Sequence, residues 1–334
     1  MSETHKRPVY PFVAIVGQDA MKTALILNAV DPSIGGVLIE GERGTAKSTA
    51  VRSLALLLPE HSVMSGCVYS CDPSDPGGMC AACRAGGRGS ETTRMRVVEL
   101  PVSATEDKVV GTIDISAAIK SGEKVFEPGI LAEANRNILY VDEVNLLNDH
   151  IVDVLLDAAA MGVNIVEREG VSYSHPSKFI LVGTMNPEEG DLRPQLLDRF
   201  GLCVRIGGIG DPETRLEIVT RRLEFDEDPE GYVEKWSDET EKLAKRIVEA
   251  KERLPEVAVG RDILTEIVEM CVSLGIDGHR GDIAMVKASK ALAAFRGKKA
   301  VGMDEVREAA SMVLPHRVKK TPFSEKGFGP ALEK

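Results

Sequence analysis

A nine-residue stretch from Gly41 to Thr49 constrains the fold of this 334-residue chain more than any other feature. It reads Gly-Glu-Arg-Gly-Thr-Ala-Lys-Ser-Thr, and it lies between an apolar run, residues 36–40, and a helical apolar pattern. A loop of this kind between a strand and a helix surrounds phosphate groups with backbone N–H groups and the helix N-terminus. We therefore expect a nucleotide-binding loop that consists of Gly41, Gly44, Thr45, Ala46, Lys47, Ser48 and Thr49.

Two side chains of this loop are expected to contact ATP and its metal ion. Lys47 would reach the β- and γ-phosphates, and the Ser48 hydroxyl would complete the coordination of Mg²⁺. The residue before such a lysine is usually glycine, whereas this chain has Ala46. Its methyl group is compatible with the loop if the backbone angle φ is negative, which we expect. A glycine-rich turn that arises by chance is the alternative, and the complete spacing disfavours it.

Two carboxylates at the end of a later apolar run extend the predicted site. Asp142 and Glu143 lie about 95 positions after Lys47. Asp142 would hold Mg²⁺ through its water shell, and Glu143 would polarise the attacking water. Acids at a strand end are commonly only a solvated terminus, but their place in this chain favours hydrolysis of a nucleoside triphosphate. Asn186, after the next apolar run, could orient the water beside the γ-phosphate.

The first 224 residues alternate short apolar runs with amphipathic helical patterns, which predicts an α/β domain with a parallel sheet flanked by helices. The runs are short and rich in β-branched residues, as strands buried on both faces are. The predicted strands are residues 36–40, 96–100, 137–142 and 179–183.

The chain changes character after residue 224. Residues 226–241 contain eight acids and one lysine, so we expect 225–242 to be an exposed and mobile acidic linker. The remaining residues, 243–334, contain no strand pattern, and we expect them to form a small all-α lid domain. Apolar residues recur at helical spacing in residues 243–254, 263–274, 284–295 and 304–313.

Composition excludes several classes of protein. The net charge of −11 and the aromatic content of 4% argue against a nucleic-acid-binding surface. The longest apolar runs, such as Leu54–Leu58, are too short to span a membrane, and the N-terminal residues do not resemble a signal peptide. Six cysteines in a chain of this length are not a disulfide scaffold. We expect a soluble, cytoplasmic protein.

Three segments resemble a known family. They are Val16-Gly17-Gln18, residues 31–37, and residues 185–200, which run from Met-Asn-Pro-Glu-Glu-Gly to Leu-Leu-Asp-Arg-Phe. With these segments the chain resembles the I subunit of magnesium chelatase, an AAA+ ATPase, over about residues 8–320. The last segment, which includes Glu188 and Arg193, is much more specific to the family than the phosphate loop.

The resemblance implies an ATP-hydrolysing motor that forms a homo-oligomeric ring, commonly a hexamer, and hydrolyses ATP between protomers. It implies two partners: a second AAA+ subunit with an integrin-type domain, and a large subunit that holds the tetrapyrrole and inserts the metal. It assigns the arginine finger to Arg199 and the second sensor to Arg280, and we count Val16, Gly17 and Gln18 among the nucleotide-binding residues.

The residues alone leave the roles of these arginines open. An arginine in the segment 191–200 could reach the nucleotide of a neighbouring subunit, or it could pair with Asp198 at the surface. Arg280 opens a predicted helix, from which it could fold back onto the phosphates. The identity of the inserted metal stays open among magnesium, cobalt and nickel, and the six scattered histidines suggest that a partner handles it.

Two insertions follow from the pattern. Residues 105–133 are too long for one simple helix and contain Gly111, so they resemble the insertion that interrupts the second helix in this AAA+ clade. Residues 163–166 and 171–174 flank Glu169-Gly170, which predicts a hairpin. In related motors such elements face the pore of the ring or the partners; a plain surface insertion is the alternative for both.

Four cysteines lie close together in a loop insertion, residues 67–90. Their spacing is Cys67-x3-Cys71-x8-Cys80-x2-Cys83. Four thiolates can bind structural Zn²⁺ tetrahedrally. They could equally form redox-sensitive disulfides or stay reduced thiols in a flexible loop. Cys203 and Cys271 lie in apolar patterns and are expected in the core.

These observations lead to three hypotheses about function. The first is an ATP-driven motor subunit of a tetrapyrrole metal chelatase, of the magnesium or cobalt type. The second is a remodelling chaperone of the related MoxR type that matures a metalloprotein. The third is a nucleic-acid motor of the same AAA+ clade, which the acidic composition disfavours most.

Overall fold

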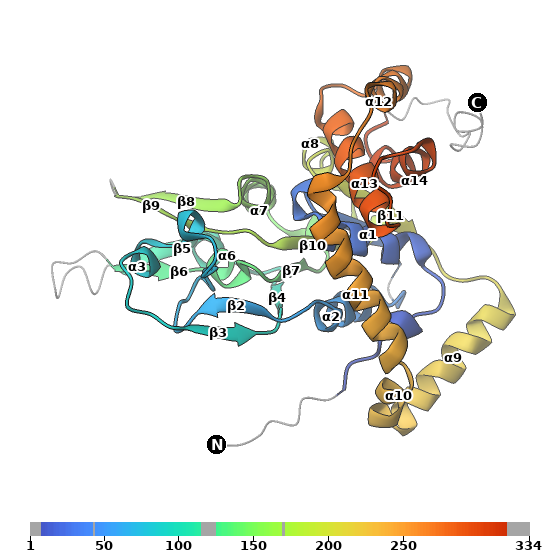
Figure 1. The fold of residues 1–334 in the computed structure, drawn as a ribbon, viewed down its shortest axis with the longest axis horizontal. Coiled ribbons are helices and arrows are strands. Elements are labelled where there is room, and N and C mark those ends of the chain that lie inside the picture. Colours follow the sequence, from blue (N-terminus) through green and yellow to red (C-terminus); the bar gives the residue numbers. More distant parts are fainter. Residues whose placement is uncertain (1–7, 43, 115–124, 169–170, 319–334) are drawn as a thin grey trace.

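Five parallel strands form the central sheet of the computed structural model, which describes residues 8–42, 44–114, 125–168 and 171–318 (Figure 1). In the order β11-β1-β10-β7-β4 they are β1 (Val37–Gly41), β4 (Val97–Leu100), β7 (Ile138–Val141), β10 (Ile180–Met185) and β11 (Leu202–Ile206). The four predicted strands are confirmed. The sequence reading missed β11, in which Arg205 interrupts the apolar run; its Nε lies 2.7 Å from Oε2 of Glu40 on β1.

The register brings the carboxyl ends of the strands to one edge. Glu40 of β1 lies beside Met185 of β10, and Gly183 of β10 lies beside Val141 of β7. Loops that follow parallel strands therefore meet at this edge, which is where open α/β sheets bind ligands. The strands β1, β7 and β10 are buried along their whole length, as their apolar sequences predict.

Helices cover both faces of the sheet. One apolar core joins α1 (Asp19–Val30) and α2 (Lys47–Leu57) to the sheet and to the C-terminal helices. A second core lies between the other face and α4 (Glu106–Val110), α6 (Ile130–Ala134) and α7 (Asp149–Met161). Short 3₁₀ turns lie at Phe12–Ala14, Pro32–Ile34, Pro76–Gly78, Val144–Leu146, Pro187–Glu189 and Leu254–Glu256.

Three antiparallel hairpins extend from the sheet. They are β2 (His61–Met64) with β3 (Ser90–Thr93), β5 (Gly111–Asp114) with β6 (Val125–Pro128), and β8 (Val163–Arg168) with β9 (Val171–Pro176). The predicted insertion 105–133 thus holds β5–β6 between two short helices, and the predicted hairpin around Glu169-Gly170 is confirmed, although Glu169 and Gly170 lie outside the described residues. All three hairpins lie on the side of the molecule away from the C-terminal helices (Figure 1).

The segment 225–242, which we expected to be an exposed and mobile acidic linker, is helical, and its acids are exposed. It comprises the end of α9 (Pro212–Glu227), α10 (Pro229–Lys235) and the start of α11 (Ser237–Arg253). Phe225 and Tyr232 are buried against Tyr10 and Ala14 near the N-terminus. The acids dominate the composition of the segment, but they lie on the exposed faces of its helices, and its aromatic residues anchor it.

The C-terminal helices match the sequence prediction. After α11 they are α12 (Arg261–Ser273), α13 (Arg280–Phe295) and α14 (Met303–Val313). Buried alanines of α13, among them Ala288 and Ala291, let its neighbours approach closely. Among the described residues, no helix combines the length and apolar composition needed to cross a bilayer.

Candidate nucleotide site

The phosphate loop leaves β1 at Gly41 and enters α2 at Lys47. A Cβ atom at Gly41 would lie 2.4 Å from the backbone oxygen of Ile206, so only glycine fits there. Gly44 has φ +81°, in the left-handed region that favours glycine. The first-turn N–H groups of α2 have no partner within the helix and are directed at this loop. The loop can therefore accept an anion.

Ala46 also adopts the left-handed conformation, with φ 61° and ψ 18°. The expectation of a negative φ at this position is wrong. The loop geometry requires a positive φ before Lys47, which explains why glycine is usual here. An alanine in this region costs about 1 kcal/mol of backbone strain. Ala46 is exposed, so its methyl group gains little packing in return.

Replacing Ala46 by glycine is therefore expected to raise the free energy of unfolding by roughly 0.5–1 kcal/mol, since the relief of strain exceeds the added entropy of the unfolded chain. Urea denaturation measures this change. Ala50 lies inside α2 and is fully buried, so Ala50→Gly serves as the control and should destabilise. A loss of stability in both variants would contradict the strain at Ala46.

Polar side chains of the loop bond to the loop itself. The Lys47 ammonium group donates to the backbone oxygens of Gly41 and Glu42, the latter at 3.2 Å. The Thr45 hydroxyl donates to the backbone oxygen of Glu42 at 2.8 Å. Ser48 lies in the first turn of α2 and is half-buried. The lysine thus lies across the mouth of the loop, within reach of a bound phosphate.

The acidic end of β7 is tied to the end of β10. The Thr184 hydroxyl donates to Oδ1 of Asp142 at 2.5 Å and accepts the backbone N–H of Glu143 at 3.1 Å. The Tyr140 hydroxyl donates to the same Asp142 oxygen at 2.8 Å, and burial raises the pKa of Tyr140, which keeps it a donor. Glu143 has φ 53° and stands at the turn that follows.

Thr184 was missed as a site residue by the sequence reading. It is buried, and it joins the acidic pair to the strand that carries Asn186. A hydroxyl residue two positions before Asn186 was the available signal. Asn186 is also buried, and its Oδ1 accepts the N–H of Glu188 at 3.2 Å, so its side chain is held at the end of β10.

A cavity of about 460 Å³ opens beside the phosphate loop. Val16 and Gln18 line it together with Thr45 and Ala46, and Gln18 donates to the backbone oxygen of Gly207 at 3.2 Å. The structure therefore brings Val16 and Gln18 to the phosphate loop. Gly44 and Thr49 of the predicted loop also line it, and the rest of the wall comes from residues that were not predicted: Tyr10, Ile15, Glu42, Gly207, Gly208, Ile209, Arg215, Ile218, Val219 and Arg222.

Arg199 follows α8 (Pro194–Leu197) and faces α7. Its Nη1 donates to Oδ1 of Asp157 at 2.8 Å and lies 3.1 Å from Oδ1 of Asp153. The alternative in which this arginine pairs with Asp198 is therefore wrong. Asp153 and Asp157 lie one helical turn apart on α7, so they present their carboxylates to the same guanidinium group.

Two other arginines, Arg280 and Arg317, contact Asp198. Arg280 at the start of α13 places Nη1 3.3 Å from Oδ2 of Asp198, so it points at this loop. Arg317 is buried and donates to the backbone oxygens of Asp198 and Phe200, at 2.9 and 2.6 Å. Its Nε lies 3.2 Å from Oδ1 of Asp198 without a hydrogen bond, so this contact is electrostatic. The C-terminal domain therefore holds the backbone on both sides of Arg199.

His316 adds a pH-dependent contact to this junction. Its Nε2 lies 3.0 Å from the backbone oxygen of Phe200, and burial, with the neighbouring Arg317, lowers its pKa to about 3. Above pH 6.5 the imidazole is neutral in both the folded and the unfolded chain. Below that pH only the unfolded chain binds the proton, so stability is lost as the pH falls from about 6.5 toward 3.

Between pH 7 and pH 5 the titration of His316 is expected to lower the free energy of unfolding by about 2 kcal/mol. We expect His316→Gln to abolish this loss, since glutamine can keep the bond to Phe200 but does not titrate. Urea denaturation at several pH values measures the slope. His150→Gln, an exposed histidine beside Glu106, is the control and should keep the wild-type slope. An unchanged slope in His316→Gln would contradict this assignment.

The four clustered cysteines converge at the tip of the β2–β3 hairpin, in the loop that contains α3 (Ala81–Arg84). They lie outside the nucleotide cavity. Cys203 and Cys271 are buried, as predicted.

Two AAA families match parts of this chain. Residues 88–200 match the AAA domain of the dynein-related subfamily, and residues 264–333 match the AAA lid domain. The Methanocaldococcus jannaschii protein named magnesium-chelatase subunit ChlI homolog is 58% identical over 319 residues, which cover 94% of this chain and 87% of that protein. The chain belongs to the magnesium-chelatase I-subunit family.

This chain is similarly close to other members of the magnesium-chelatase I-subunit family. Magnesium-chelatase subunit ChlI of a Nostoc species is 52% identical over 98% of this chain and 89% of its own length. A structure of the complex between subunits BchI and BchD of magnesium chelatase, based on cryo-EM, matches 95% of this chain and 98% of its own. The identity is 50% and the TM-score 0.56. The AAA+ fold predicted from the sequence is thus confirmed.

Proposed function

We propose that this chain is the ATP-hydrolysing motor subunit of a tetrapyrrole metal chelatase of the magnesium or cobalt type. The observation that carries the proposal is the meeting of three segments at one edge of the sheet. The phosphate loop follows β1, the pair Asp142-Glu143 follows β7, and Thr184 with Asn186 ends β10. Together they supply a phosphate cradle, a metal-holding acid with a base, and a polar group for the attacking water.

The residues at this edge fit MgATP. Gly41 and Gly44 keep the loop backbone open to phosphate oxygens, and the adjoining cavity offers apolar walls from Ile15, Val16 and Ile209 for a base. When bound, MgATP supplies the phosphoanhydride bond whose hydrolysis drives the motor. Ser48 and Asp142 would hold Mg²⁺.

The remaining side chains have distinct roles. Lys47 would exchange the backbone oxygens of Gly41 and Glu42 for phosphate oxygens. Glu143 would accept the proton of the attacking water, and Asn186 would orient that water. Thr184 positions the acidic pair, because one hydroxyl bonds both Asp142 and the backbone of Glu143.

Ring formation completes the site in this proposal. Arg199 is held by α7 acids of its own chain and would reach the nucleotide of the neighbouring protomer in a ring, commonly a hexamer. Arg280 would sense the nucleotide from the lid domain, since it already contacts Asp198 beside Arg199. Movement of the lid would thereby shift the loop that carries Arg199.

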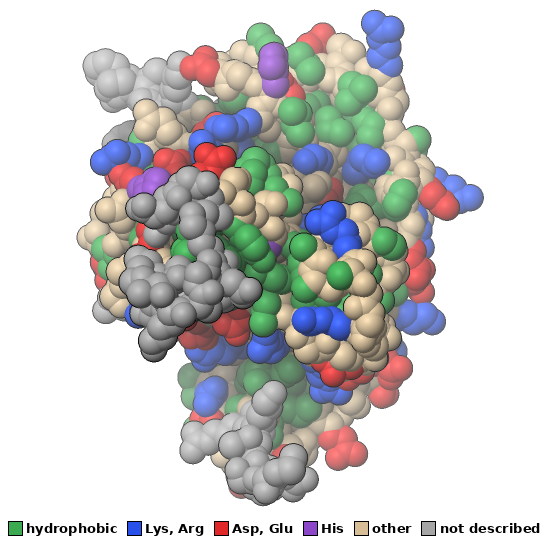
Figure 2. Space-filling model, turned by 90° about the vertical axis from the view of Figure 1, so that its left-hand side faces the viewer, with side chains coloured by type: hydrophobic (Ala, Val, Ile, Leu, Met, Phe, Trp, Pro, Cys, Tyr) green, Lys and Arg blue, Asp and Glu red, His purple; other side chains and the backbone are tan. Residues whose placement is uncertain are grey.

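The hairpins are the surface that we assign to partners: a second AAA+ subunit with an integrin-type domain, and a large tetrapyrrole-binding subunit. Figure 2 shows this end of the molecule, where hydrophobic side chains lie among Lys, Arg, Asp and Glu. Val163 and Ile165 of β8 are exposed, and so is Val68 in the loop that contains the four clustered cysteines. A surface of mixed charge with exposed apolar residues suits a protein partner better than a nucleic acid. The six thiols suit the reducing cytoplasm, in which we place the chain.

Copurification followed by reconstitution tests the proposal. A pull-down from the source organism should recover a large tetrapyrrole-binding subunit, and the assembled proteins should insert metal into the macrocycle only with ATP. Mg²⁺, Co²⁺ and Ni²⁺ are supplied in parallel, and the absorption of the macrocycle reports insertion. Recovery of an unrelated metalloenzyme, without chelation by any mixture, would instead identify a MoxR-type chaperone.

A further inference from the structure

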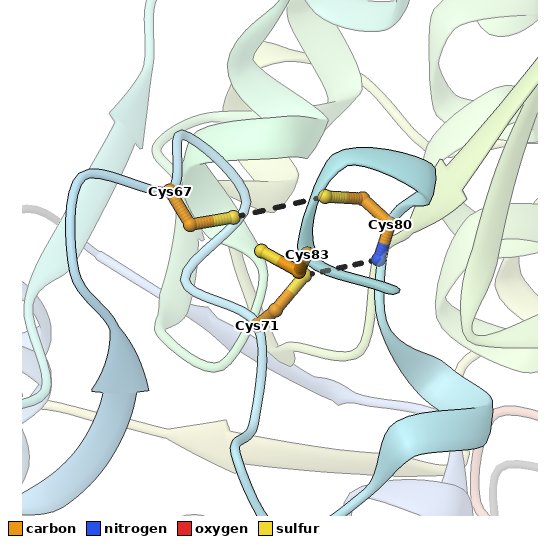
Figure 3. A group of neighbouring side chains, drawn as sticks. All are labelled: Cys67, Cys71, Cys80 and Cys83. Carbon is orange, nitrogen blue, oxygen red and sulfur yellow. Dashed lines mark hydrogen bonds between the residues drawn. The ribbon is translucent and has the colours of Figure 1, made fainter. Parts of the chain in front are cut away.

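The cysteine loop, residues 65–89, brings four thiols from two separate turns to one point. Cys67 and Cys71 lie on either side of the turn at residues 68–69, Cys80 precedes the first residue of α3, and Cys83 lies within α3. All four sulfur atoms lie within 4.8 Å of one another, and those of Cys67 and Cys80 are 3.9 Å apart. The side chains point toward a common centre (Figure 3).

This spacing matches a tetrahedral metal site. A Zn–S bond length of about 2.3 Å places the sulfur atoms of a tetrahedron about 3.8 Å apart. A disulfide instead joins two sulfur atoms at about 2.0 Å and separates them into pairs. The backbone N–H of Cys80 donates to Sγ of Cys71 at 3.2 Å, a contact that stabilises a thiolate ligand and fixes its direction.

The surroundings give the site a structural rather than a catalytic character. Cys71, Cys80 and Cys83 are 5% exposed or less, and they form a small separate core with Met64, Tyr69 and Ala132. A core of this size contributes little stability by itself, and small units of this kind commonly rely on a metal. Four protein ligands leave no open coordination position for a substrate.

We propose that Cys67, Cys71, Cys80 and Cys83 bind one Zn²⁺ ion as a structural site. Four Zn–S bonds form, and the four thiol protons leave to solvent; no electron is transferred. The four ligands belong to a small core of their own, and none of them lines the nucleotide cavity.

The contacts of the loop indicate what the ion would hold in place. Tyr69 lies between the thiols and the β8–β9 hairpin: its hydroxyl oxygen is 2.9 Å from that of Tyr173, and its ring stacks on His175. Its backbone oxygen accepts the side-chain amide of Asn135 at 2.6 Å. Asp72, next to Cys71, pairs with Arg136 at 2.9 Å. Zinc would therefore fix the loop against β8–β9 and against the turn that enters β7.

Metal analysis of the full-length chain tests the site. Chain purified from zinc-supplemented cells under reducing conditions should contain about one zinc per chain, and X-ray absorption should show four sulfur neighbours at about 2.3 Å. Co²⁺ introduced in place of zinc should give the thiolate charge-transfer and tetrahedral d–d bands. These measurements use the unaltered chain, so they do not depend on the folding of a variant.

Variants then assign the ligands. Cys83→Ala should lower the zinc content to less than about one tenth per chain, whereas Cys271→Ala, a buried thiol of α12, should keep one zinc. Removal of zinc should speed amide exchange in residues 65–89 and 172–176 and leave α13 unchanged. The proposal is overturned if the unaltered chain holds no zinc, if Cys67, Cys71, Cys80 or Cys83 forms a disulfide, or if the chain carries an iron–sulfur chromophore instead.

Discussion

Replacing Arg199 by alanine is expected to lower ATP turnover by about 10³-fold or more, because a guanidinium group at the γ-phosphate stabilises the charge of the transition state. The structure holds Arg199 through Asp153 and Asp157 at the surface of its own α7. In the proposed ring it would exchange these acids for the nucleotide of a neighbouring protomer. Steady-state ATPase assays measure the loss. Arg94→Ala, an exposed arginine paired with Glu60 on the β2–β3 side, is the control and should keep full activity.

Mixing two inactive variants tests whether the site is shared. Arg199→Ala keeps Glu143, and Glu143→Gln keeps Arg199. In a mixed ring some interfaces combine an intact arginine with an intact glutamate, so the mixture should regain ATPase activity that neither variant has alone. Mixed oligomers without any regained activity would show that Arg199 does not act across the interface.

The second large effect is expected for Glu143→Gln, with a turnover about 10² to 10⁴-fold lower and nucleotide affinity close to that of the unaltered chain. Glutamine has the same shape but cannot accept the proton of the attacking water. The backbone N–H of Glu143 would keep its bond to Thr184, so the local fold should persist. Equilibrium binding of a fluorescent ATP analogue, together with single-turnover hydrolysis, separates affinity from chemistry.

Two comparisons sharpen this test. Glu91→Gln changes an exposed glutamate of β3 and should leave turnover unchanged. Asp142→Asn should weaken binding of MgATP more than binding of ATP alone, because Asp142 is assigned to the metal. Turnover at the level of the unaltered chain in Glu143→Gln would refute its role as the base.

Much of the fold could be predicted from local pattern. The strands β1, β4, β7 and β10 are short apolar runs, and the four C-terminal helices follow an apolar repeat of helical period. The sequence pattern gave incorrect or incomplete predictions where contacts between distant residues determine the local structure. The acids of 225–242 predicted a mobile linker, but Phe225 and Tyr232 bury their rings against Tyr10 and make the segment helical. Arg205 interrupts the apolar run of β11, so the pattern did not predict this strand. In the fold, Arg205 forms an ion pair with Glu40 on the neighbouring strand β1.

The candidate site shows the same division. Motif spacing predicted the phosphate loop, the acidic pair and Asn186, because each depends on residues adjacent in the chain. The sequence could not reveal that the Thr184 hydroxyl bonds both Asp142 and the backbone of Glu143, or that Gly207 and Ile209 line the same cavity as Val16. These contacts join residues that lie far apart in the chain, and no local pattern carries them.

The sequence by itself predicted an α/β domain with a phosphate loop, an acidic strand end and a helical C-terminal region, and its resemblance to a known family implied the AAA+ fold. Such features arise from residues that are close in the chain and obey backbone geometry. Only the tertiary structure decided the conformation of Ala46, the partners of Arg199 and Arg280, and the convergence of the four thiols. The reason is physical: strain depends on the neighbouring loop, and a guanidinium or thiol is directed by whichever groups the packed chain brings within a few ångströms.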